Sequence, residues 1–190
     1  MNAKYVGIFA KPEYFVAFFL FILTIYGMEK TIYIAGGCFW GVEAYYDLLK
    51  GVVKTRVGYI NGSSENPSYQ DLKAHRADHA EAVEIVYEDS AISLEKLLEH
   101  YLRFVDPYSV DKQGEDVGHQ YRTGVFFVDP NDEAVIKAYL DTHLNPGYAI
   151  EIGKMLNFYD AEEYHQKYLE KNPNGYCHIN LSIINKSERK

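Results

Sequence analysis

The sequence predicts an α/β (α+β) fold, a ferredoxin-like split-βαβ sandwich of two layers with an extra C-terminal helix and coil. Short β-branched, apolar runs alternate with segments whose apolar residues recur at helical spacing. Their order, βαββαβ, is typical of a split-βαβ fold whose helices cover one face of the sheet. A chain of 190 residues is long enough for one domain with a sizeable core.

The predicted elements follow one another along the chain. Strands are expected at residues 31–35, 54–60, 81–87 and 124–128, with a further strand at 148–153. Helices are expected at residues 40–50, 93–104, 131–143 and 161–170. The strand segments are apolar and rich in β-branched residues, whereas the helical segments repeat their apolar residues with the period of a helix turn.

Local signals mark several boundaries and two long loops. Ser93 followed by Glu95 opens one helix, Asp106-Pro107 closes it, and Asp129-Pro130 precedes the next. The stretches 61–80 and 106–122 are rich in glycine, proline and polar residues. Because binding and catalytic residues are concentrated on loops, we expect function in these two stretches.

The pentapeptide Gly37-Cys38-Phe39-Trp40-Gly41 is the strongest candidate for a reactive site. A strand precedes it and a helix follows, so Gly36-Gly37 makes the turn and Cys38 falls in or just before the first helical turn. There the free N–H groups and the helix dipole favour an anion, which predicts a lowered pKa for the thiol. Most single cysteines are small buried hydrophobic residues, but two flanking glycines clear the approach to this one.

Composition and spacing exclude several classes of function. The net charge of −8 argues against a nucleic-acid partner, whose binding sites are basic. The seven histidines are scattered, so we expect no metal site. Gly36-Gly37 is too short for a nucleotide-binding loop. Two cysteines, Cys38 and Cys177, are too few for a disulfide scaffold and suit a reduced compartment or a pair that cycles.

Five motifs occur in the order in which one known family has them. They are Gly37-Cys38-Phe39-Trp40-Gly41 followed by Glu43, Asn66-Pro67-Ser68-Tyr69, His79-Ala80-Glu81-Ala82-Val83, Gln113-Gly114-Glu115-Asp116-Val117-Gly118-His119-Gln120-Tyr121-Arg122, and Asn172-Pro173-Asn174-Gly175-Tyr176-Cys177. Through them the chain resembles the methionine sulfoxide reductase A family, the peptide-methionine (S)-S-oxide reductases. The resemblance implies an α/β sandwich with its site near the rim. It also implies reduction of methionine S-sulfoxide, free and protein-bound, in the repair of oxidised proteins.

Reduction of a sulfoxide requires a nucleophile for the sulfur and a proton for the departing oxygen. Cys38 is the candidate nucleophile, and the resemblance assigns the acid to Glu81. Glu81 opens an apolar strand, where burial would raise the pKa of its carboxyl group. The resemblance further implies that Tyr69 and Tyr121 hydrogen-bond the sulfoxide oxygen and that Asp116 is a supporting carboxylate. Without it, each of these would be regarded as an ordinary surface residue.

The residues after the thiol have their own interpretation. Phe39 and Trp40 supply apolar contacts for the substrate S-methyl group, since aromatic rings make favourable contacts with sulfur. The alternative is that both rings only pack the helix onto the sheet. Glu43 is interpreted as a capping carboxylate of the first helical turn and not as a catalyst.

Cys177 is the expected resolving cysteine. Attack on the sulfoxide leaves Cys38 as a sulfenic acid, and a second thiol is needed to convert it to a disulfide. Cys177 is the only other cysteine, and it follows a turn-rich segment. The resemblance implies thioredoxin as the external reductant of the Cys38–Cys177 disulfide, with no bound cofactor. We expect a monomer. A buried tail cysteine is the alternative.

The first 27 residues differ from the rest. Residues 14–26 form a continuous apolar run, shorter than a spanning helix needs but as long as a signal-peptide core. Three interpretations stay open: Met28 is the true start, the segment is an uncleaved anchor, or it is a cleaved signal. We predict an extension at residues 1–27 and a catalytic domain at 28–190, in the cytoplasm unless the apolar run anchors or exports it.

Two other functions are considered. A cysteine-dependent acyl transferase or hydrolase would use Cys38 with a histidine base and would turn over an ester. A membrane-tethered peptide-binding module would use the N-terminal segment as anchor and would tolerate Cys38→Ser, which a reductase would not.

Overall fold

A computed structural model of the chain describes residues 27–190. The apolar run at residues 14–26, and with it the choice among the three interpretations of the N-terminal extension, lies outside the described residues. Among the helices of the described part, none is both long and apolar enough to cross a membrane.

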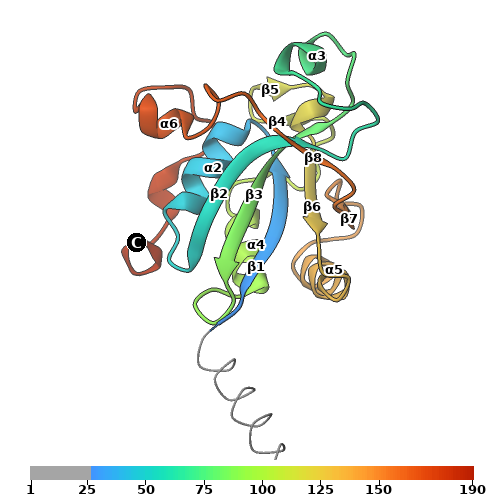
Figure 1. Ribbon diagram of the computed structural model, residues 1–190. Helices are drawn as coiled ribbons and strands as arrows, with labels where there is room; N and C mark the ends of the chain where they lie inside the picture. The colour runs from blue at the N-terminus through green and yellow to red at the C-terminus, as the bar shows by residue number, and fades with distance from the viewer. Residues whose placement is uncertain (1–26) are drawn as a thin grey trace, which may run out of the picture.

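The framework is a curved six-stranded sheet in the order β7-β6-β1-β3-β2-β8 (Figure 1). Its strands are β1 (Glu29–Gly36), β2 (Val52–Ile60), β3 (Ala80–Glu88), β6 (Thr123–Phe127), β7 (Glu151–Lys154) and β8 (Phe158–Asp160). Neighbours in the central set β6-β1-β3-β2 are antiparallel, and β7 runs parallel to β6. A helical connection leads from β1 to β2, and β3 lies between these two strands. A second helical connection leads from β3 to β6, and β1 lies between them. This arrangement confirms the split-βαβ fold.

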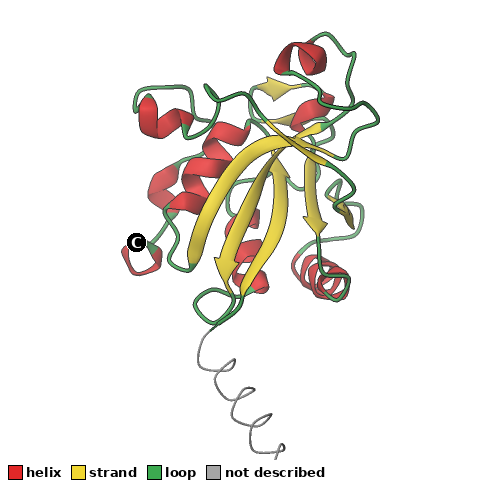
Figure 2. Ribbon diagram, in the orientation of Figure 1, coloured by secondary structure: helices red, strands yellow, loops and turns green. Residues whose placement is uncertain are grey.

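The long helices are α2 (Phe39–Asp47), α4 (Leu94–Leu102) and α5 (Asp132–His143). The helices lie beside the sheet (Figure 2), and their buried side chains join those of the sheet in one large core. Alternation along β1 explains the layers: Ile32 and Ile34 point into this core, whereas Tyr33 and Ala35 belong to a smaller cluster on the opposite face. That second face is covered by Met155 and Phe158 instead of a helix.

The two long loops contain short elements that the sequence did not predict. They are α3 (Tyr69–Lys73), the hairpin β4 (Lys112–Gln113) and β5 (Asp116–Val117), and the 3₁₀ turn η1 (His119–Tyr121). A capping box explains α3: the Ser68 hydroxyl accepts from the Asp71 N–H, and the Asp71 carboxylate accepts from the Ser68 N–H.

The predicted helix at residues 161–170 is wrong. Only α6 (Tyr168–Lys171) is helical there, and Lys167 before it has left-handed backbone angles. The side chain of Gln166 pairs with the main chain of Val57, accepting at 3.1 Å and donating at 2.9 Å. These contacts with β2 override the helical spacing of the segment.

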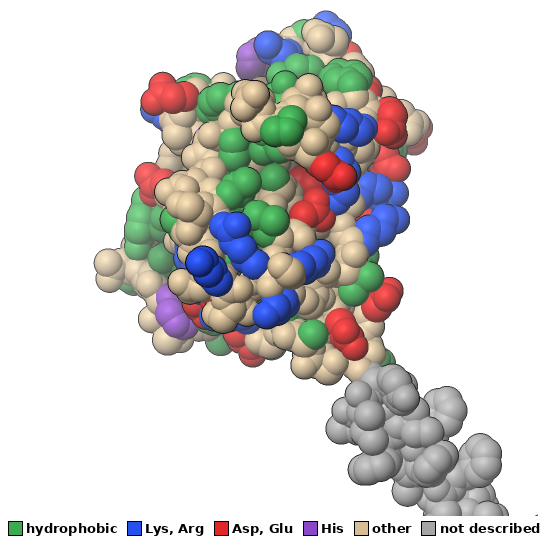
Figure 3. Space-filling view, turned by 90° about the vertical axis from the view of Figure 1, so that its left-hand side faces the viewer, with side chains coloured by type: hydrophobic (Ala, Val, Ile, Leu, Met, Phe, Trp, Pro, Cys, Tyr) green, Lys and Arg blue, Asp and Glu red, His purple; other side chains and the backbone are tan. Residues whose placement is uncertain are grey.

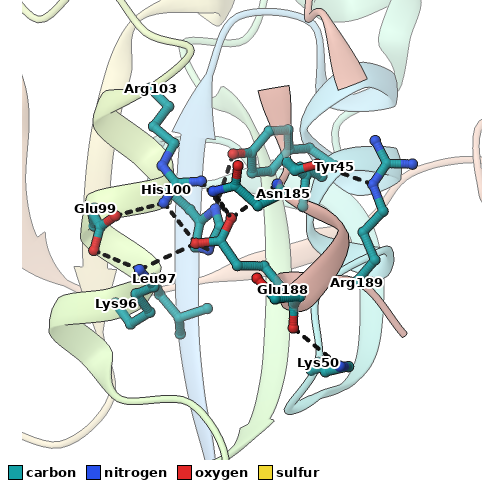
Figure 4. A network of polar contacts seen from close by, with 12 residues as sticks. Tyr45, Lys50, Lys96, Leu97, Glu99, His100, Arg103, Asn185, Glu188 and Arg189 are labelled. Atoms are coloured by element: carbon teal, nitrogen blue, oxygen red, sulfur yellow. Dashed lines mark hydrogen bonds and ion pairs between the residues drawn. The ribbon is translucent and has the colours of Figure 1, made fainter. Parts of the chain in front are cut away.

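The C-terminal tail lies over α2 and α4 and is held by charges (Figure 4). It carries the 3₁₀ turns η2 (Leu181–Ile183) and η3 (Lys186–Glu188). Both carboxylate oxygens of Glu188 accept from Arg103, each at 2.8 Å, and Lys96 lies 3.2 Å away. The main chain adds to this, since the Lys50 N–H donates to the Glu188 carbonyl at 2.9 Å. The tail is therefore fastened beyond Cys177.

Candidate active site

The turn between β1 and α2 places Cys38 at the N-cap of α2, as the sequence predicts. Gly37 there has a φ of 85°, which suits glycine. A Cβ at Gly37 would also lie 2.8 Å from the Gln113 Cβ and 3.0 Å from the His178 Nε2. Glycine is therefore required both for the turn and for the close approach of a loop and the tail.

The thiol of Cys38 does not have the lowered pKa that the sequence predicts. Cys38 is only 7% exposed. Burial raises the pKa of its thiol, and the negative charge of a nearby Glu81 carboxylate adds to this effect. A hydrogen bond from the main chain of Trp40 acts in the opposite direction but is the smaller effect. In the resting site Cys38 is thus a neutral thiol, because desolvation outweighs the helix terminus.

Glu81 lies at the start of β3, beside the end of β1, and is 1% exposed. Its Oε2 accepts the main-chain N–H of Phe39 at 3.1 Å. Burial raises the pKa of this carboxyl group to about 8, against the smaller opposing effect of that hydrogen bond. At neutral pH Glu81 carries a proton that it can donate.

Cys38 and Glu81 share a small cavity of about 130 Å³ with all of the predicted substrate-contacting residues. Its lining consists of Cys38, Phe39, Trp40, Tyr69, Glu81, Asp116, Tyr121, His165 and Tyr176. Tyr69 comes from α3, Asp116 from β5 and Tyr121 from η1, so both predicted loops contribute. Burial raises the pKa of Tyr69 and of Tyr121, which leaves both phenols as hydrogen-bond donors.

Asp116 differs from the other lining residues in its contacts. Its side chain is 14% exposed, and its Oδ2 lies 3.5 Å from the Nδ1 of His178 in the tail. Among the described residues, neither of these two atoms has a hydrogen-bond partner. Asp116 therefore stands between the cavity and the segment that follows Cys177.

Two aromatic lining residues, His165 and Tyr176, are not among the residues that the sequence predicts for the site. His165 is 1% exposed, and its Nδ1 accepts the indole N–H of Trp40 at 3.0 Å. It was hidden within the wrongly predicted helix at 161–170. Tyr176 precedes Cys177 in the motif that ends at Cys177, and this position is the sequence signal for it. Glu43 does not cap α2, contrary to the expectation from the sequence, because its carboxylate is buried and accepts from Lys167 and Thr55.

Cys177 lies outside the cavity but close to the helix that carries Cys38. It is half-buried, its thiol donates to the Ile179 carbonyl at 3.2 Å, and burial raises its pKa. A Cβ at Gly41 would lie 3.2 Å from the Cys177 Sγ. Because Gly41 is in the first turn after Cys38, the two thiols face the same end of α2. Both cysteines are free.

The site defines a cysteine-dependent enzyme with a protonated buried acid and a second thiol nearby. Within residues 27–190, no group of three or more metal-ligating side chains is arranged to hold a metal ion. Nor does any histidine in this part of the chain form a hydrogen bond with Cys38, which the acyl-transfer alternative requires.

Comparisons with known proteins agree with this class. The family model for peptide methionine sulfoxide reductase matches residues 30–190. Peptide methionine sulfoxide reductase MsrA of Lachnoclostridium phytofermentans is 54% identical over 155 residues, covering 80% of this chain and 93% of that protein. Mxr1 from Saccharomyces cerevisiae in reduced form matches with a TM-score of 0.71 at 37% identity, over 78% of this chain and 88% of that one. Mxr1 in complex with Trx2 matches with a TM-score of 0.50 at 29% identity, over 74% and 84%.

The chain belongs to the peptide methionine sulfoxide reductase family. It is an oxidoreductase that reduces methionine sulfoxide in a thiol-dependent reaction. Neither the acyl-transfer alternative nor the membrane-tethered binding module is supported by these matches.

Proposed function

We propose that Cys38 attacks the sulfur of methionine sulfoxide while Glu81 donates its proton to the sulfoxide oxygen. The thiol proton of Cys38 passes to Glu81 in exchange, and the oxygen passes to Cys38, so that the sulfoxide becomes a thioether and the thiol becomes a sulfenic acid. The observation that carries this proposal is the shared cavity: a thiol and a buried carboxyl group with a pKa of about 8 line the same small space. A cavity of about 130 Å³ suits a methylsulfinyl group.

The remaining lining residues orient that group in the proposal. Tyr69 and Tyr121 donate hydrogen bonds to the sulfoxide oxygen, and Asp116 supports the polar side of the cavity. Phe39 and Trp40 contact the S-methyl group, since both rings line the space next to the thiol. This fixed separation of polar and apolar walls favours one configuration at sulfur, which we propose to be S, in free and in protein-bound methionine sulfoxide.

Cys177 completes the cycle in this proposal. Its thiol attacks the sulfenic sulfur of Cys38, a disulfide forms, and water leaves. An external dithiol then reduces the Cys38–Cys177 disulfide and is itself oxidised. We propose thioredoxin for this step, without a bound cofactor, and the complex of Mxr1 with Trx2 supports a partner of that kind.

The catalytic unit in this proposal is residues 28–190, supported by the family match over residues 30–190. In this proposal it acts as a monomer. A reducing compartment such as the cytoplasm suits two free cysteines.

The test is thioredoxin-coupled NADPH oxidation with the separate S and R forms of a blocked methionine sulfoxide. Turnover of the S form alone, lost in Cys38→Ser, is the expected result. Failure of the folded enzyme to turn over either form would overturn the proposal. An ester substrate serves as the control for acyl transfer.

A further inference from the structure

Lys167 has an unusual backbone conformation for its type. Its φ of 51° and ψ of 40° are left-handed, which costs a residue with a Cβ about 1 kcal/mol. The main-chain N–H of Lys167 donates to Glu43 Oε2 at 2.8 Å. Glu43 projects from α2 and is 1% exposed. A buried carboxylate thus accepts a hydrogen bond from the backbone of a residue whose conformation is unfavourable.

Two residues near Lys167, His165 two positions before it and Tyr168 directly after it, both contact Trp40. His165 accepts the indole N–H at 3.0 Å. The ring of Tyr168 stacks on the indole with 3.7 Å between centroids and an interplanar angle of 14°. The left-handed turn at Lys167 is therefore what allows one short segment to present a hydrogen-bond acceptor and a flat ring to the same indole.

Close packing holds only part of this segment: His165 is buried with its ring edge-on to Phe39, but the residues directly after Lys167 are not buried. The helix α6 has no buried residue. A hollow of about 360 Å³ lies between α2, α6 and the tail, and its lining includes Trp40, Glu43, Asp47 and Lys167. This is the side of the molecule where hydrophobic side chains gather next to lysine and arginine side chains in Figure 3. The polar link from Glu43 therefore fixes the main chain of Lys167 on α2, while Gln166 holds the preceding residue on β2.

Lys167 has a second connection to α2 that serves as a comparison. Its Nζ lies 2.6 Å from Asp47 Oδ2 and 3.5 Å from Glu43 Oε1. Burial raises the pKa of Glu43, and the charge of Lys167 acts against this effect. The side-chain ion pair and the main-chain hydrogen bond can be separated by substitution, because Asp47 takes part only in the first.

We propose that Glu43 is a positioning residue that acts through the main-chain N–H of Lys167 to keep His165 and Tyr168 against Trp40. The proposal rests on the proposed function only in that Trp40 contacts the substrate. The role of Glu43 is to accept one hydrogen bond at a set distance from α2. Its negative charge is not what matters.

Two substitutions distinguish the effect of the hydrogen bond to Lys167 from the effect of the negative charge on Glu43. Glu43→Gln keeps an oxygen acceptor at the same reach without the charge, whereas Glu43→Asp keeps the charge but is one methylene too short for the Lys167 N–H. Trp40 is the only tryptophan of the chain, so intrinsic fluorescence reports directly on its surroundings. Glu43→Asp is expected to move the emission to longer wavelength, because the indole gains water when Tyr168 leaves its face.

Kinetics provide the second readout. Glu43→Asp is expected to raise KM for methionine sulfoxide at least about threefold. The kcat is expected to stay nearly unchanged, because the substrate and the transition state lose the same contact with Trp40. Glu43→Gln and the matched control Asp47→Asn are expected to retain the emission and KM of the parent enzyme. Thermal unfolding shows whether each variant is folded.

The opposite pattern overturns the proposal. If Glu43→Gln shifts the emission while Glu43→Asp does not, charge is the relevant property. If Asp47→Asn shifts it, the side-chain ion pair positions the segment. An enzyme without reductase activity that still gives the expected emission pattern would refute the proposed function and leave the positioning of Trp40 intact.

Discussion

The main-chain N–H of Phe39 donates to the carboxyl group of Glu81 at 3.1 Å, so the first turn of the helix that begins at the thiol is joined directly to the acid. One carboxyl oxygen is used in this bond. The other remains available to a substrate in the cavity that both residues line. The acid is thereby oriented by the same helix that carries the nucleophile.

Glu81→Gln is expected to reduce turnover by about 10²- to 10⁴-fold, the usual contribution of a general acid. In the parent enzyme, kcat/KM is expected to fall as the pH rises through about 8, where the carboxyl group loses its proton. Steady-state rates from pH 6 to 9.5 check this. Glu84→Gln is the matched control, since Glu84 is on the same strand but pairs with Arg56. An unchanged pH profile in Glu81→Gln would contradict the assignment.

Glu81 also predicts how stability depends on pH. Its pKa rises from 4.5 to about 8 on folding, so the folded protein binds more protons between these values. The free energy of unfolding is therefore expected to decrease as the pH rises from about 4.5 to about 8, by an amount on the order of a few kcal/mol. Urea unfolding at pH 5.5 and 8.5 measures this. Glu81→Gln should lessen the decrease, and a decrease of equal size in the variant would contradict the prediction.

Gly41→Ala is expected to slow disulfide formation without changing the first chemical step. The added Cβ would lie 3.2 Å from the Cys177 Sγ, so the resolving segment must move away from α2. Rapid-quench measurement of methionine formation and of thiol loss separates the two steps. Gly153→Ala is the control, because its Cβ would meet Phe126 only at 3.6 Å, an ordinary contact. Equal rates in both variants would show that Cys177 approaches by another route.

Cys177→Ser is expected to form about one methionine per enzyme and then stop with the thioredoxin system, because the sulfenic acid has no partner thiol. Trapping with dimedone followed by mass spectrometry should locate the adduct on Cys38. Continued thioredoxin-dependent turnover at the parent rate would instead mean that the reductant attacks Cys38 directly.

The tail contact at Glu188 is expected to contribute to stability. The bidentate bond with Arg103 lowers the pKa of Glu188, so its contribution is present above the pKa of the unfolded chain and is lost in acid. Glu188→Gln should lower the free energy of unfolding at pH 7 by about 1 kcal/mol or more. Glu99→Gln is the control, since Glu99 contacts Arg103 without joining the tail. Equal losses in both variants would contradict a tail-specific role.

Much of the fold and part of the site could be predicted because they depend on local signals. A short run of β-branched and apolar residues predicted β1, and the glycine turn predicted Cys38 at the start of α2. The pKa of Cys38 could not be predicted in this way, because burial by distant segments reverses the effect of the helix terminus. The helix expected at 161–170 failed for the same kind of reason: Gln166 and Lys167 bond to β2 and α2, far away in sequence.

The antiparallel pairing of β1 with β3 has a consequence for how this chain tolerates insertions. Ile34 is paired with Val83, and this register brings the start of β3 beside the end of β1. A slip of two residues would preserve the inward and outward faces of both strands, yet it would carry the acid about 7 Å along the sheet. A two-residue insertion early in β3 would thus leave a folded, well-packed protein in which Glu81 no longer lies beside Cys38.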